Sequence, residues 1–65
     1  MITVNGERIN WPEGKNLETL LTERGYPLNR VAVELDDRIV PKTEYAGCVP
    51  KDGSHLEIVC FVGGG

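Results

Sequence analysis

Three glycines, Gly63, Gly64 and Gly65, follow directly on an alternating apolar segment at the end of the sequence. Because glycine has no Cβ, such an end can extend through a channel too narrow for any side chain and present its α-carboxylate inside another protein. The candidate reactive group is therefore the carboxylate of Gly65, with Gly63 and Gly64 as the slim lead into a partner's active site. The alternative is a frayed terminus or a cloning remnant, but a remnant would not need an apolar strand leading straight into it.

Other residues capable of chemistry have simpler interpretations. His55 is the only histidine, and beside Ser54 at the start of a predicted strand it is expected to be a surface residue, not a catalytic base. The adjacent carboxylates of Asp36 and Asp37 are typical of a solvated turn, where neighbouring side chains diverge. The sequence thus predicts no catalytic residue and no metal site.

The two cysteines, Cys48 and Cys60, lack the close spacing of a CxxC redox or zinc motif, so both are expected to be free thiols. Cys60 lies in the last predicted strand, in phase with Leu56 and Ile58, and is expected to face inward as a small buried hydrophobic residue. No nearby cation or helix terminus in the sequence supports a persulfide-carrying role for either thiol.

Length and charge exclude several functions. A chain of 65 residues makes one small domain that buries roughly 60% of its unfolded surface, which leaves no deep substrate cleft and argues against a self-contained enzyme. The formal charge is −3 with both signs interleaved, so no basic stripe predicts nucleic-acid binding. No long apolar run predicts a signal peptide or a membrane span, and a cytoplasmic location is expected.

The elements that would carry the glycines begin with a hairpin over residues 2–11. The dipeptide Asn5-Gly6 favours a two-residue type I′ turn, which requires positive φ at both positions. Pairing Val4 with Glu7 and Ile2 with Ile9 puts the apolar residues on one face. These residues are Ile2, Val4, Ile9 and Trp11.

One short amphipathic helix is predicted over residues 16–24. Asn16 is a suitable N-cap, and Gly25 can end the helix in a left-handed conformation. So short a helix is marginal by itself, and its stability must come from packing an apolar face on a sheet. That face is formed by Leu17, Leu20 and Leu21.

The remaining strands are predicted over residues 31–35, 39–40 and 56–62, and residues 42–51 are expected to form a loop with a single helical turn. A helix between strands favours one parallel pair in an otherwise antiparallel sheet. One helix can cover only one face of that sheet. The other face is expected to be functional surface.

In the order of these elements and in its length, the sequence resembles the ThiS-type sulfur carriers of thiamine (thiazole) biosynthesis. The resemblance rests on five features: the start at residues 1–6, the helix at 17–21, the stretch 31–41, Asp52-Gly53 followed by 56–59, and the glycine end. It implies an α+β, ubiquitin-like β-grasp fold with a mixed four- to five-stranded sheet wrapped around one main helix. The β-grasp domain is expected to span residues 1–62, with a flexible glycine tail at 63–65.

The resemblance also implies a reaction. An E1-like adenylyltransferase (ThiF-like), using ATP and Mg²⁺, would adenylate Gly65, and sulfur from a donor such as a cysteine desulfurase would convert it to a thiocarboxylate for thiazole synthase (ThiG-like). The chain itself would bind no cofactor and would be a substrate of these enzymes, not an enzyme. Val59, Phe61 and Val62 are expected to contact the partners.

Three other functions stay open at this point. The small subunit of molybdopterin synthase has the same fold and a thiocarboxylate end but is usually longer. A ubiquitin-like modifier would instead transfer its activated end to lysines. A binding module with an inert tail is the third alternative.

Overall fold

A computed structural model of the chain describes residues 1–61. Val62 and the predicted tail at 63–65 lie outside the described residues, so the domain boundary at residue 62 stays a prediction. The elements in chain order are β1 (Ile2–Val4), β2 (Glu7–Ile9), α1 (Leu17–Glu23), a 3₁₀ turn (Leu28–Arg30), β3 (Val31–Leu35), β4 (Arg38–Ile39), a second 3₁₀ turn (Lys42–Glu44) and β5 (His55–Cys60).

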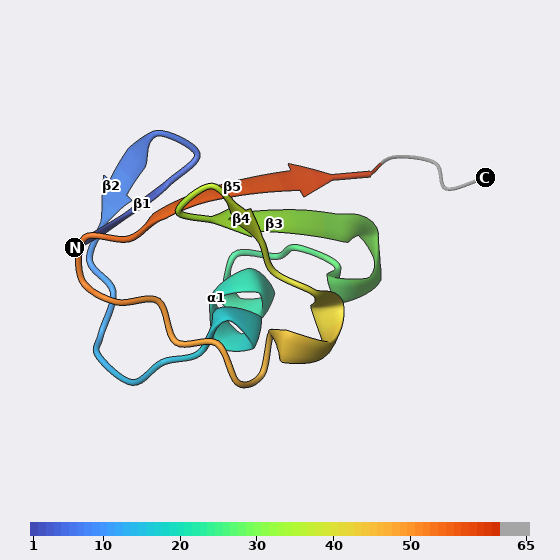
Figure 1. Ribbon diagram of the computed structural model, residues 1–65, viewed down its shortest axis with the longest axis horizontal. Helices are drawn as coiled ribbons and strands as arrows, with labels where there is room; N and C mark the ends of the chain where they lie inside the picture. The colour runs from blue at the N-terminus through green and yellow to red at the C-terminus, as the bar shows by residue number, and fades with distance from the viewer. Residues whose placement is uncertain (62–65) are drawn as a thin grey trace.

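The five strands form one mixed sheet in the order β2-β1-β5-β3-β4. β1 and β5 run parallel, and the other neighbouring pairs run antiparallel. Figure 1 shows α1 lying against one side of this sheet. The architecture confirms the predicted α+β, β-grasp arrangement. Among the described residues, no helix covers the opposite side of the sheet.

The first hairpin forms as predicted. Asn5 and Gly6 have φ of 50° and 84°, the conformation that a type I′ turn demands. The register pairs Ile2 with Ile9, so the turn and the apolar alternation agree.

Both caps of α1 match the sequence signals. The Asn16 side chain accepts a hydrogen bond from the Thr19 amide at 2.8 Å. At the other end Gly25 has φ 80°, and the Tyr26 amide donates to the Leu21 carbonyl at 2.8 Å, which is the bond of a Schellman motif. The helix is therefore seven residues long because its ends are fixed by side-chain and backbone bonds.

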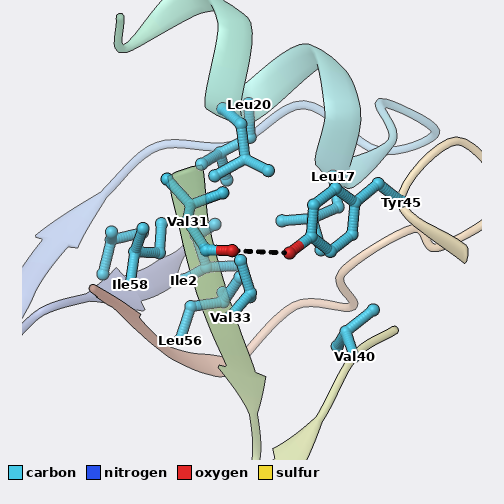
Figure 2. Close-up of a cluster of buried hydrophobic side chains, with 11 residues drawn as sticks. Ile2, Leu17, Leu20, Val31, Val33, Val40, Tyr45, Leu56 and Ile58 are labelled. Carbon is cyan, nitrogen blue, oxygen red and sulfur yellow. Dashed lines mark hydrogen bonds between the residues drawn. The ribbon is translucent and has the colours of Figure 1, made fainter. Parts of the chain in front are cut away.

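The core lies between α1 and the inner face of the sheet (Figure 2). The three leucines of the helix are completely buried against residues of β1, β3 and β5. The Tyr45 hydroxyl donates to the Val31 carbonyl at 3.5 Å, and burial raises the pKa of this tyrosine. The buried apolar residues are Ile2, Val4, Leu17, Leu20, Leu21, Val31, Val33, Val40, Tyr45, Leu56 and Ile58.

The fourth strand is shifted by one residue from its predicted position at 39–40. Asp36 and Asp37 form a tight turn with φ of 49° and 68°, so pairing resumes at once and β4 is Arg38–Ile39. Ile39 consequently lies opposite Glu34 on the outer face and is 76% exposed. Val40 turns inward instead and is buried.

The prediction that Cys60 is buried is wrong. Leu56 and Ile58 are buried as their alternation predicts, but Cys60, two residues further on, is exposed. β1 pairs with β5 only as far as Val4 opposite Leu56, so no strand of the described chain flanks Cys60 on that edge. Alternation sets the side of the sheet that a residue faces, but burial needs neighbours on that side.

Candidate docking surface at the last strand

β5 begins beside the N-terminus (Figure 1) and is the last element before the glycines in the sequence. Its start is fixed by the Gly53 amide, which donates to the Met1 carbonyl at 2.8 Å. The N-terminal ammonium of Met1 also pairs with the Asp52 carboxylate. The hydrogen bond from that ammonium, together with its charge, lowers the pKa of Asp52.

The side chain of Asn5 holds the middle of β5. Its Oδ1 accepts the Ile58 amide at 2.7 Å, and its Nδ2 donates to the Ile58 carbonyl at 3.1 Å and to the Tyr26 hydroxyl at 3.5 Å. One side chain thus takes the place that the backbone of a further β1 residue would occupy. Sequence reasoning treated Asn5 only as a turn residue, and no local signal indicated that it binds a strand 53 positions away.

On the opposite edge, Asp36 makes a comparable contact with the start of β5. Its Oδ1 accepts the His55 amide at 2.9 Å, and its own amide donates to the His55 carbonyl at 2.8 Å. The Asp36 carboxylate therefore orders a strand. Among residues 1–61, no group of three or more His, Cys, Asp and Glu side chains could hold a metal ion.

The outer face of the sheet carries an exposed apolar patch at the end of β5. Val59 and Phe61 are 57% and 54% exposed, and Ala32 lies directly opposite Val59. The Phe61 amide donates to the Arg30 carbonyl at 2.6 Å, which continues the pairing with the segment before β3. The outer apolar patch comprises Ala32, Ile39, Val59 and Phe61.

Of the predicted contact residues, Val59 and Phe61 are placed where a partner can reach them, whereas Val62 is outside the described residues. Ile39 was missed because the fourth strand was predicted one residue too late. The turn at Asp36-Asp37 is the signal that could have found it, since a two-residue turn sets Ile39 opposite Glu34.

The two thiols have different environments. Burial, and then the nearby carboxylate of Glu44, raise the pKa of the Cys48 thiol, which disfavours the reactive thiolate. Cys60 is exposed, and both cysteines are free. No helix in the described part of the chain has the length and apolar character needed to cross a membrane.

A mixed five-stranded sheet that curves around a single helix defines the class of ubiquitin-like β-grasp proteins. Within this class, the model of the ThiS family matches residues 1–65, which is the whole chain. The chain therefore belongs to the ThiS family.

Solved structures agree with this assignment. The crystal structure of the thiamine biosynthesis protein ThiS from Geobacter metallireducens superimposes with a TM-score of 0.78 and 30% sequence identity. The match covers 98% of this chain and 97% of that one. The predicted fold and family are thus confirmed.

Two curated relatives are larger proteins. Thiazole synthase from Paramagnetospirillum magneticum is 45% identical over 64 residues, and thiazole synthase from Magnetococcus marinus is 38% identical over the same length. Each match covers 98% of this chain but only 20% of the relative. The chain thus spans about a fifth of the length of these synthases.

Proposed function

We propose that this chain is a sulfur carrier in thiamine biosynthesis and that the sulfur is carried as a thiocarboxylate at Gly65. The observation that supports it most directly is the match to the ThiS family over the whole chain, glycine end included. The similarity to two thiazole synthases supports a thiazole synthase as the enzyme that receives the sulfur.

The chemistry requires activation by another protein. A carboxylate is a poor electrophile until one oxygen becomes a good leaving group, as it does in a mixed anhydride with AMP. An E1-like adenylyltransferase with ATP and Mg²⁺ would supply that step, and a donor such as a cysteine desulfurase would supply the sulfur. The catalytic groups then belong to the partners, and this chain is their substrate.

The outer apolar patch is the proposed handle for those enzymes. Val59 lies in β5 and Phe61 directly follows the strand, so a partner that covers them also meets the residues that precede Gly65 in the sequence. Exposed apolar side chains that precede the reactive end would provide affinity, while the glycines Gly63 and Gly64 would provide access. Ile39 and Ala32 extend this surface across β3 to β4.

Complementation tests the pathway. The chain is expressed in a bacterium that lacks its own ThiS and needs added thiazole, and growth without thiazole is expected. A variant lacking Gly64 and Gly65 should be folded and should fail to support growth. Rescue of molybdenum-cofactor synthesis instead of thiazole synthesis would contradict the proposal, as would conjugation of the chain to lysines of other proteins without sulfur transfer.

A further inference from the structure

One edge of β5 is open beyond Ile58. The backbone of β1 pairs with β5 as far as Val4 opposite Leu56, and the Asn5 side chain then binds both the amide and the carbonyl of Ile58. After Asn5 the chain turns away into β2, as Figure 1 shows. The position beside the last part of β5 is therefore empty within residues 1–61.

The backbone of Cys60 faces this empty position. Along a strand, alternate residues direct their amide and carbonyl groups to the same edge. Ile58 directs both groups toward Asn5, and Phe61 directs its amide toward Arg30 on the other edge. Cys60 is in phase with Ile58, and nothing in residues 1–61 hydrogen-bonds its amide or carbonyl on the open edge.

Such an edge behaves differently in the free protein and in a complex. Water satisfies the Cys60 backbone groups while the edge is exposed. When a partner covers Val59 and Phe61 and takes up the tail, that water is displaced, and unpaired backbone groups would then oppose binding. An extended segment of the partner can satisfy them by adding a strand to the sheet.

We propose that the open edge of β5 at Cys60 pairs with an extended main-chain segment of thiazole synthase, which occupies the position that β1 leaves empty. This inference rests on the proposed function for the tail but concerns how the carrier is recognised. Thiazole synthase is the chosen occupant because two such enzymes contain, within one polypeptide, a segment that matches nearly all of this chain. The pairing would begin where the bonds of Asn5 end.

A pair of substitutions at one position tests the edge. Cys60→Pro removes the amide hydrogen that faces the open edge and places a ring there, while the bonds of Val59 and Phe61 to β3 and Arg30 stay available. Cys60→Val is the matched control, because it changes the side chain and keeps the amide. The cognate thiazole synthase is the ligand, and affinity is measured by titration calorimetry.

Cys60→Pro is expected to weaken binding about tenfold or more, whereas Cys60→Val should stay within about twofold of the unaltered chain. Thermal unfolding of both variants shows whether the fold is kept. Equal affinity of the two folded variants would overturn the proposal.

Hydrogen exchange supplies a second measurement if the proline variant fails to fold. In the unaltered chain, exchange of the Cys60 amide should slow about tenfold or more when thiazole synthase is added. Unchanged exchange in the complex, or protection by the adenylyltransferase alone, would overturn the proposed pairing. Protection of Cys60 without any sulfur transfer from Gly65 would support the pairing and contradict the proposed function instead.

Discussion

The two halves of β5 differ in what surrounds them. Residues 55–58 are bonded on both edges, by β1 and Asn5 on one side and by β3 and Asp36 on the other, and they bury Leu56 and Ile58. The second half consists of Val59 and Cys60 together with Phe61, which directly follows the strand. Within residues 1–61 it is bonded on one edge, and all three side chains are exposed. One segment thus serves first as the centre of a core and then as a surface that precedes the proposed reactive end.

This difference separates the residues that stabilise the fold from those proposed to bind a partner. The first half supplies contacts that keep the small domain of this 65-residue chain folded, and losing a few kcal/mol matters there because small domains are only marginally stable. The second half contributes little to the core, and its side chains are free to contact another protein. Substitutions along β5 should therefore change stability and partner binding separately.

The largest expected effect is in the first half. Leu56→Ala removes a side chain that is only 1% exposed and should lower the free energy of unfolding by about 3 kcal/mol. Val59→Ala, in the second half, should change it by about 0.5 kcal/mol or less. Urea denaturation followed by circular dichroism measures both values. Similar losses at the two positions would show that the halves do not differ.

Asn5 binds Ile58 at the end of the first half, and its replacement should have the next largest effect. Asn5→Ala removes both side-chain hydrogen bonds to Ile58. It also places alanine at φ 50°, a conformation that asparagine tolerates better, so the free energy of unfolding should fall by about 2 kcal/mol.

Asn5→Gly is the matched variant, because glycine adopts positive φ without strain and loses only the side-chain bonds. The loss of stability in Asn5→Gly should be roughly half of that in Asn5→Ala. Thermal unfolding of the two variants gives the comparison. A melting temperature unchanged in both would mean that the hydrogen bonds between the Asn5 side chain and Ile58 do not stabilise β5.

Phe61→Ser tests the second half directly. Phe61 is 54% exposed, so stability should change by about 0.5 kcal/mol or less, whereas affinity for the adenylyltransferase or thiazole synthase should fall about tenfold. Surface plasmon resonance measures the affinity. Thr43→Ala, at an exposed position in the second 3₁₀ turn, is a control that should alter neither quantity. Full affinity in Phe61→Ser would remove this residue from the docking surface.

The smallest effect concerns the start of β5. In the folded chain, the N-terminal ammonium lowers the pKa of Asp52. The contribution of this ion pair to stability is therefore fully present above the unfolded pKa of about 3.9, and it is lost as the pH falls through the lower folded pKa. Asp52→Asn should therefore make the melting temperature fall less steeply between about pH 4 and pH 2. If the melting temperatures of Asp52→Asn and of the unaltered chain fell equally steeply with pH, the ion pair between Asp52 and the N-terminus would be contradicted.

Local signals predicted much of this fold. The turn at Asn5-Gly6 and the caps at Asn16 and Gly25 follow from backbone preferences of single residues, and the register of the first hairpin follows from its two-residue turn. These features depend on neighbours within a few positions, so sequence alone was sufficient for them.

The features that sequence missed depend on distant segments. The exposure of Cys60 is decided by where β1 ends, and the second role of Asn5 is decided by a strand at the other end of the chain. Ile39 depended on the exact length of the turn before it. The chemistry assigned to Gly65 came from family resemblance, because a glycine end has no side chain whose surroundings could indicate its reaction.

Intact-mass analysis tests the carrier proposal most directly. The chain is incubated with its E1-like adenylyltransferase, ATP, Mg²⁺ and a cysteine desulfurase with cysteine, and fragmentation then locates any modification. The proposal predicts replacement of one oxygen by sulfur at the carboxylate of Gly65, dependent on ATP. An unmodified Gly65 in the presence of an adenylyltransferase that is active on another ThiS protein would contradict it.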